Sequence, residues 1–250
     1  MSIQQLFVAG SNAPLLIADS ATFDGSNDNM LRGADLSGNA DSKTGIFSAW
    51  VKNAASATQY DILTNTGSKL LILYDGTAAL DKFQLIARNA AATIILNIET
   101  SATIGAGTWY HLLASWDLAT TTAHLYVTDV SNKIETTVTN DTIDYTVADW
   151  AVGSNTASGT RYDGDMAEMY FAPGQYLDFS LVTNRRKFIS ASGKPVRLGS
   201  TGAQPTGTAP LVYLHLDDAE AVANFATNRA TGGNFTITGT LTTGSTSPSD

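Results

Sequence analysis

The stretch that decides the fold is TWYHLLASWDLATTTAHLYV, residues Thr108–Val127. In its first half every other side chain is apolar or aromatic and shares one face: Tyr110, Leu112, Ala114 and Trp116. Side chains of a β-strand point alternately to the two faces of its sheet, so this period predicts a strand over Trp109–Trp116. A second apolar run begins after the turn sequence DLATTT and predicts another strand over Ala123–Thr128.

The rest of the chain repeats this organisation. Short apolar runs alternate with clusters such as DGSND, NTGS and GSNTASGT, whose residues favour turns. The runs predict further strands over 14–23, 45–52, 69–74, 82–88, 93–99, 133–138, 165–172, 211–216 and 234–241. One short helix is predicted over Leu181–Ser190, after the capping sequence Asp178-Phe179-Ser180. This pattern indicates an all-β protein, an antiparallel sandwich of two sheets with one short helix.

Composition narrows the classes of function. Of 250 residues, 43% are hydrophobic and 15% charged, which excludes a disordered chain. The net charge of −9 repels phosphate backbones, so nucleic acid is not an expected partner. The absence of Cys excludes disulfides and zinc–thiolate sites. We expect neither a secretory signal nor membrane insertion, because MSIQQLFVAG lacks a signal-peptide pattern and no window has about 18 apolar residues.

Four segments follow one another in an informative order. They are ATFDGSNDNML at Ala21–Leu31, GIFSAWVK at Gly45–Lys52, the deciding stretch Thr108–Val127, and YDGDMAEMYFAPGQYLDFSLV at Tyr162–Val182. Together they resemble the LamG-like jelly-roll domains of the concanavalin A-like lectin/glucanase superfamily. The resemblance implies a concanavalin A-like jelly roll, with two antiparallel sheets packed face to face.

A second resemblance concerns the C-terminal segment Gly232–Asp250, GGNFTITGTLTTGSTSPSD. It is similar to the ends of tailed-phage virion proteins that carry this domain. The resemblance implies a virion-surface protein whose partners are other virion proteins and a host-surface glycan. A homo-oligomer such as a trimer suits that role, because many copies strengthen weak sugar contacts. The alternative is a purely structural capsid decoration or clamp protein without a glycan site.

The chain is interpreted as one sandwich with a segment at each end. Residues 22–241 form the LamG-like jelly roll, and residues 242–250 form an extended C-terminal tail. Met1–Ala21 are N-terminal strands or an anchor that adds a strand to a partner sheet. The alternative for this segment is that it completes the same sandwich.

Trp150, Tyr162, Arg161 and Asp163 are the candidate residues for carbohydrate binding. Trp150 follows IDYTVAD in a turn-rich region, where we expect a position at the rim of the sandwich. Sugars stack on aromatic faces, while carboxylate and guanidinium groups bind their hydroxyls. The alternative is that these four are ordinary residues of a sandwich edge. The remaining tryptophans lie in or next to predicted strands and are expected in the core: Trp50, Trp109 and Trp116.

Calcium is the cofactor that the resemblance implies, because many relatives bind one Ca²⁺ at an end of a sheet. The candidate ligands are Asp24, Asp28, Asp163 and Asp165, which lie in two of the matched segments. Ca²⁺ needs six to eight oxygen ligands, which Asp carboxylates on short loops supply. One departure from the family counts against the site, because Ala167 stands where the family has Asp. The alternative is that the nineteen Asp residues, against four Glu, serve turns only.

Catalysis is not expected. Glucanases of this superfamily carry E-x-D-x-x-E on one strand, and none of the four Glu residues begins such a pattern. The serine-hydrolase and P-loop motifs are also absent. The sequence therefore favours a non-enzymatic, lectin-like protein that binds carbohydrate by multivalent adhesion. A polysaccharide-degrading enzyme of the same fold is the least favoured alternative.

Overall fold

The computed structural model describes residues 18–55, 58–77 and 81–250, which form two antiparallel sheets of eight strands each. The strands of the first sheet are β1 (Ala21–Asp24), β3 (Thr44–Asn53), β8 (Tyr110–Asp117), β9 (Thr122–Val127), β10 (Val130–Ser131), β13 (Asp163–Pro173), β14 (Val212–Leu214) and β16 (Thr242–Thr243). They run in the order β10-β9-β8-β3-β13-β1-β16, and β14 also pairs with β13.

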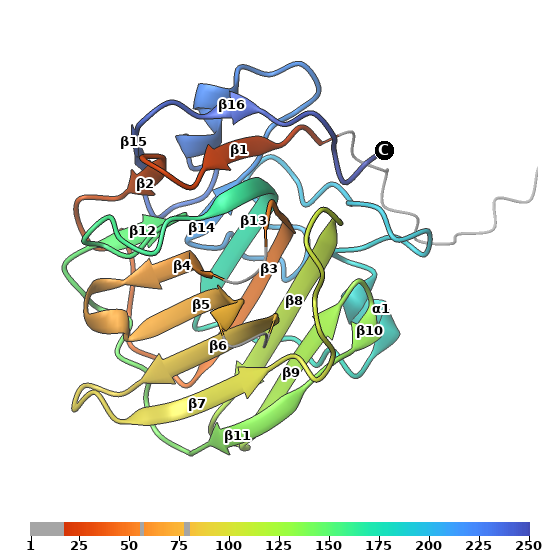
Figure 1. The fold of residues 1–250 in the computed structure, drawn as a ribbon. Coiled ribbons are helices and arrows are strands. Elements are labelled where there is room, and N and C mark those ends of the chain that lie inside the picture. Colours follow the sequence, from red (N-terminus) through yellow and green to blue (C-terminus); the bar gives the residue numbers. More distant parts are fainter. Residues whose placement is uncertain (1–17, 56–57, 78–80) are drawn as a thin grey trace, which may run out of the picture.

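The second sheet faces the first and follows the order β11-β7-β6-β5-β4-β12-β2-β15. Its strands are β2 (Asn29–Leu31), β4 (Gln59–Asn65), β5 (Leu70–Asp75), β6 (Lys82–Arg88), β7 (Ile94–Glu99), β11 (Ile134–Val138), β12 (Trp150–Val152) and β15 (Thr236–Thr238). In Figure 1, β4 to β7 belong to this layer and β3, β8 and β9 to the other. The prediction of an all-β, two-sheet jelly-roll sandwich is confirmed.

The stretch that predicted the fold forms the hairpin of β8 and β9. Trp116 pairs with Ala123 and Leu112 pairs with Val127, so the two predicted strands lie side by side. The inward face of β8 contributes to the core between the sheets through Leu112, Ala114 and Trp116. Burial of that core is the main stabilising contribution, at about 25 cal/mol for each Å² of apolar surface.

The outer face of the first sheet is buried as well. The segment 174–210 folds back over it and packs Phe179, Phe188, Val196 and Leu198 against Ile46, Leu113 and Tyr170. This segment contains the helix α1 (Val182–Arg185), and the described residues also form the 3₁₀ helices η1 (Thr66–Ser68) and η3 (Val222–Ala226). Apolar residues are therefore needed on both faces of β3, β8 and β13.

The helix α1 is shorter than the predicted segment Leu181–Ser190. Its first turn has no side-chain cap, because Leu181 occupies the N-cap position. Beyond Arg185, Phe188 packs in the cluster on the outer face of the first sheet, while Ile189 packs against Trp50. Because Phe188 and Ile189 pack against different clusters, the helix ends at Arg185, before both residues.

The ends of the chain differ in how far they are described. Residues 1–17, which include most of the proposed anchor, lie outside the described residues. The C-terminal segment 242–250 begins with β16, which pairs with β1 and thus extends the first sheet. No helix of the described residues is long and apolar enough to cross a membrane.

Candidate functional site

The predicted aromatic patch is not a surface platform. Trp150 is fully buried in β12, its ring packs at 5.4 Å from the ring of Phe171, and its Nε1 donates to Asp35 at 3.0 Å. The prediction that Trp150 lies exposed at the rim is wrong. The physical reason is that β12 is an inner strand, paired with β2 on one side and β4 on the other, so an inward side chain enters the core.

Tyr162 is also fully buried, so the second aromatic of the predicted patch cannot stack on a sugar. Its hydroxyl donates to Asn53 at 3.0 Å, and burial raises the pKa of this phenol well above its usual value. Its neighbours Arg161 and Asp163 are half-buried. These two polar residues therefore remain near the surface without an exposed aromatic partner.

The carboxylates proposed for calcium come from segments that do meet, since Asp24 pairs with Asp163 in the β1–β13 register. Burial first, and then the negative charge of Asp24, raise the pKa of Asp163. The pKa of Asp24 is lowered instead, because the backbone N–H groups of Ser26 and Asn27 donate to its carboxylate. The surroundings of Asp24 and Asp163 therefore shift the pKa values of these two carboxyl groups in opposite directions.

The other two carboxylates are used elsewhere. Asp28 accepts backbone N–H groups of Asp24 at 3.1 Å and Thr240 at 2.7 Å. Asp165 accepts hydrogen bonds from Thr22 Oγ1 at 2.5 Å and from Lys52 Nζ at 3.3 Å. Within the described residues no group of three or more His, Cys, Asp or Glu side chains could hold a metal ion. The four Asp residues therefore do not fit the oxygen cage that Ca²⁺ requires, which favours the alternative that they serve turns and internal hydrogen bonds.

A groove on the outer face of the first sheet is the better candidate site. It encloses about 370 Å³ and is lined by Trp50 and Lys52 of β3, by Trp109, by Lys194 and by the C-terminal Thr246. We call it the Trp109 groove. The ring of Trp109 is half-buried, so part of one aromatic surface remains accessible, whereas Trp50 is 3% exposed and forms the floor.

The floor of the Trp109 groove is rigid because it is packed from below. The rings of Trp50 and His111 stack with centroids 4.8 Å apart, and Ser48 Oγ lies 2.8 Å from His111 Nε2. Burial lowers the pKa of His111 to about 3, so this imidazole is neutral and serves as packing. Trp50 also belongs to an apolar cluster with Ala167 and Ile189, against which Trp109 packs.

The wall of the groove is polar. Thr246 Oγ1 accepts hydrogen bonds from Trp109 Nε1 at 3.1 Å and from Lys52 Nζ at 2.9 Å. Lys52 also forms an ion pair with Asp165, which is how one of the predicted metal ligands comes to neighbour the groove. An aromatic ring beside hydroxyl and ammonium groups can bind a ligand that is apolar on one face and polar at its edges.

Sequence reasoning missed this site because it placed Trp109 in the core. Trp109 stands one residue before β8 begins, after the sequence GAG at Gly105–Gly107, where the backbone leaves a turn. An aromatic residue at the junction of a turn and a strand is the signal that could have revealed it. Its predicted companions Trp50 and Trp116 are buried, as expected.

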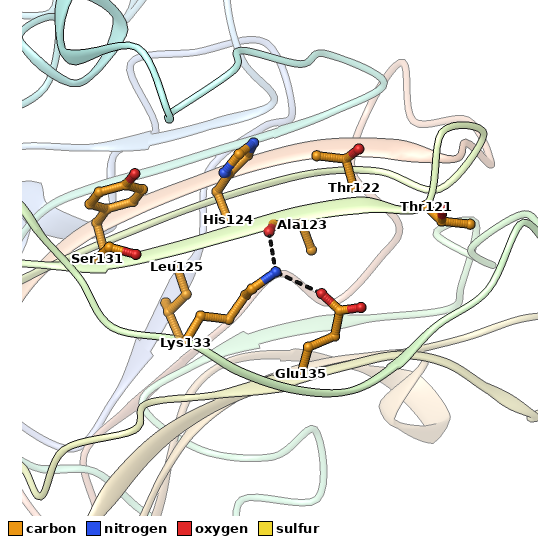
Figure 2. A pocket seen from close by; sticks show the side chains of 9 residues that line it. Thr121, Thr122, Ala123, His124, Leu125, Ser131, Lys133 and Glu135 are labelled. Atoms are coloured by element: carbon orange, nitrogen blue, oxygen red, sulfur yellow. Dashed lines mark hydrogen bonds and ion pairs between the residues drawn. The ribbon is translucent and has the colours of Figure 1, made fainter.

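A second groove at the edge of the first sheet is less suited to a stacking ligand. Figure 2 shows Lys133 reaching between the Ala123 carbonyl, at 2.7 Å, and the Glu135 carboxylate, at 2.6 Å. The ammonium group is thereby neutralised. The aromatic side chain in its lining, Tyr126, is 9% exposed and lies under the guanidinium of Arg185. The Trp109 groove therefore remains the stronger candidate.

Comparison with known proteins agrees with the fold. Among solved structures, a candidate carbohydrate-binding protein from Bacteroides ovatus is 14% identical with a TM-score of 0.65, over 92% of this chain and 60% of that chain. A heptameric SAP-like pentraxin from Limulus polyphemus is 10% identical with a TM-score of 0.55, over 91% of this chain and 94% of that chain. The chain thus spans 60% of the length of the Bacteroides protein. No curated protein sequence matches it.

The family model of the concanavalin A-like lectin/glucanases superfamily, Laminin_G_3, matches residues 11–173. These residues include the segments that carry the first resemblance up to the end of β13, and they exclude Gly232–Asp250, so the phage context stays a prediction. The match covers more than half of the chain and agrees with its two-sheet sandwich. The chain therefore belongs to the concanavalin A-like lectin/glucanases superfamily.

Proposed function

We propose that the protein binds carbohydrate in the Trp109 groove. The observation that carries this proposal is the half-buried ring of Trp109 beside the ammonium and hydroxyl groups of Lys52, Lys194 and Thr246. A pyranose ring stacks its apolar C–H face on an aromatic ring, while polar groups bind its hydroxyls. The similar structure from Bacteroides ovatus is described as a candidate carbohydrate-binding protein, which supports the same class of ligand.

The test is binding to a panel of neutral and acidic oligosaccharides by calorimetry, with wild type and Trp109→Ala compared. A stacked aromatic hot spot contributes about 2 kcal/mol, so the variant should bind about 30-fold more weakly. Tyr176→Ala is the matched control, because Tyr176 is a half-buried aromatic that stacks on His124 outside the groove. Equal glycan affinity of Trp109→Ala and wild type would show that the groove is not the site.

We also propose that binding is not followed by cleavage. Each of the four Glu side chains is engaged by a basic partner: Glu99 by Lys82, Glu135 by Lys133, Glu168 by His215 and Glu220 by Arg229. A glycosidase needs two carboxyl groups that face the scissile bond, and no Glu lines the Trp109 groove. Incubation with the bound glycans should release no reducing ends or unsaturated products, and turnover that is lost on substitution of one Asp would contradict the proposal.

The proposed setting is the surface of a phage-like particle, where many copies act together. The similarity of Gly232–Asp250 to virion proteins supports this setting. Multivalent display raises avidity by factors of about 10² to 10⁴ when the geometry allows. Sedimentation of the purified protein should reveal a homo-oligomer. A monomer at all concentrations would show that the purified protein does not by itself bring several binding sites together.

A further inference from the structure

Lys194 differs from the other lysines of the chain. All seven lie in the described part of the protein, and six ammonium groups have a partner: Lys43 with Asn140, Lys52 with Asp165, Lys69 with Asp144, Lys82 with Glu99, Lys133 with Glu135, and Lys187 with the Pro205 carbonyl. The ammonium of Lys194 has neither a hydrogen bond nor an ion pair among the described residues, and its side chain lines the Trp109 groove.

Most other polar side chains that line the groove are already engaged within the protein. Trp109 Nε1 and Lys52 Nζ both donate to Thr246 Oγ1. Thr128 Oγ1 accepts the backbone N–H of His111 at 3.3 Å, and Asp250 accepts the backbone N–H of Ser247 at 2.8 Å. Lys194 is therefore the charged group of the groove that has no partner among the described residues and can bind a ligand.

The chemistry of an ammonium group restricts what it can recognise. It carries three N–H donors, a positive charge and no acceptor. Its best partner is an anionic oxygen, because hydrogen bonds between two charged groups are stronger than those between neutral ones. A carboxylate attached to a pyranose ring satisfies both surfaces of the groove, since the ring stacks on Trp109 while the carboxylate meets Lys194.

The acidic charge of the whole chain does not oppose this assignment. Charges farther apart than about 8 Å are largely screened at physiological salt, so the groups within the groove decide. Its lining side chains contain two cations, Lys52 and Lys194, and one anion, Asp250. Lys52 is already paired with Asp165, so the charges at the groove balance, in contrast to the net −9 of the whole chain. Lys194 is the cation of the groove that no ion pair among the described residues neutralises.

We propose that the Trp109 groove selects acidic glycans, with Lys194 as the residue that recognises the sugar carboxylate. This inference rests on the proposed carbohydrate-binding function and names the class of sugar. Uronic acids and sialic acids share the required chemistry, which is a carboxylate fixed to a six-membered sugar ring. Neutral glycans would use the ring of Trp109 but would leave the charge of Lys194 unused.

The experiment compares ligand pairs that differ in one feature, the carboxylate. The pairs are an oligogalacturonate with its methyl ester, and sialyllactose with lactose, each titrated calorimetrically at low and high salt. Wild type should bind the acid of at least one pair about fivefold more tightly than its neutral counterpart at low salt, and the preference should shrink at high salt. Lys194→Gln should bind the acid and neutral forms with equal affinity, so that the ratio of the two affinities falls from about five to about one.

Lys43→Gln is the matched control, because it removes the same charge from a lysine that bonds Asn140 away from the groove. It should keep the wild-type preference, and a thermal melt should show that both variants are folded. Equal binding of acid and neutral forms by wild type would overturn the acidic-glycan assignment and leave carbohydrate binding intact. An unchanged preference in Lys194→Gln would overturn the role of Lys194. Failure to bind any sugar of the panel would overturn the proposed function itself.

Discussion

Trp150 and Trp109 have the same side chain but opposite surroundings. Trp150 is fully buried and donates a hydrogen bond to Asp35, whereas Trp109 is half-buried and donates to Thr246 at the surface. A side chain that fills the core and one that lines a groove contribute to different free energies. The first should affect unfolding, and the second should affect ligand binding.

Trp150→Ala should therefore destabilise the fold. Replacing a buried Trp by Ala leaves a cavity beside Phe171 and removes one hydrogen bond to Asp35, with an expected loss of about 3–5 kcal/mol in the free energy of unfolding. Urea unfolding followed by circular dichroism measures this loss. Trp109→Ala is the comparison and should lose much less, and equal losses in the two variants would contradict the contrast in burial.

A buried acid–base pair should make stability depend on pH. Glu168 is 3% exposed, and its carboxylate contacts His215 Nδ1 and, at 3.1 Å, the hydroxyl of Tyr213. Burial raises the pKa of Glu168. Burial alone would lower the pKa of His215, but the hydrogen bond and charge of Glu168 raise it above its usual value of 6.5. Asp217, Arg197 and Arg229 complete the charged surroundings of the pair.

The sign of the pH effect follows from both shifts. Since both pKa values are raised on folding, the folded state binds more protons than the unfolded state, and stability falls as pH rises. The contribution of His215 is fully present below pH 6.5 and is lost as pH rises through its folded pKa. Melting temperatures measured from about pH 7 to 9, where His111 is neutral in both the folded and the unfolded state, should decline in wild type, and His215→Gln should flatten this part of the profile. If the melting temperature of His215→Gln declined as steeply as that of wild type, the pH dependence would come from groups other than His215.

At the scale of single elements, β13 is the strand on which the first sheet depends. It pairs with β3 along one edge and with β1 and β14 along the other. Its register with β3 shifts between Ala167 and Tyr170, where Glu168 has a φ of 50°. The Glu168 carboxylate is therefore buried at a bulge, between the start of β1 at Ala21 and the end of β14 at Leu214.

Gly164 of β13 tests how closely this strand approaches β3. Its φ is +141°, and a Cβ atom there would lie 2.1 Å from the backbone oxygen of Lys52. Gly164→Ala should destabilise the protein by about 3 kcal/mol or more, because backbone atoms cannot move aside without breaking the β3–β13 pairing. Gly174→Ala is the control, because Gly174 also has a positive φ, of +80°, but has nothing within 4 Å of an added Cβ, and it should cost about 1 kcal/mol. Denaturant unfolding measures the free energy of unfolding of both variants. Similar losses of this free energy would contradict the clash at Gly164.

At the scale of the whole molecule, the C-terminal segment connects the first sheet with the Trp109 groove. The C-terminal segment is attached to the first sheet beside β1, since Ser20 Oγ donates to the Thr246 carbonyl at 2.9 Å and Gly244 donates its backbone N–H to the Ser20 carbonyl at 3.0 Å. The same segment supplies Thr246 to the Trp109 groove. The attachment of the tail to β1 therefore helps to shape the proposed binding site.

Removal of divalent cations should leave stability unchanged. Asp28 and Asp165 are bonded within the protein, so the paired Asp24 and Asp163 offer too few oxygens for Ca²⁺. A ligand that binds only the folded state raises its melting temperature by mass action. We therefore expect the same melting temperature with EDTA and with added Ca²⁺. A rise with Ca²⁺ that disappears in Asp163→Asn would instead establish the site predicted from the resemblance.

The fold could be predicted from the sequence because its signals are local. Alternation over Trp109–Trp116 is set by the geometry of a single strand, and turns depend on the few residues that form them. The meeting of Asp24 with Asp163 has no local signal, and it was a condition of the calcium hypothesis that rested on the family resemblance; the two residues do pair. The length of α1 was not predicted, because contacts of Phe188 and Ile189 with different clusters end it.

The sequence by itself determined the two-sheet sandwich, its family and the absence of familiar catalytic motifs, because strand periodicity and turn chemistry are properties of adjacent residues. Only the tertiary structure decided which tryptophan is accessible. Trp150 lies between β2 and β4 in the second sheet, and Trp109 lies beside the C-terminal Thr246. Burial is a sum over neighbours that are distant in sequence, so no local pattern distinguishes a buried aromatic in a short strand from one that lines a groove.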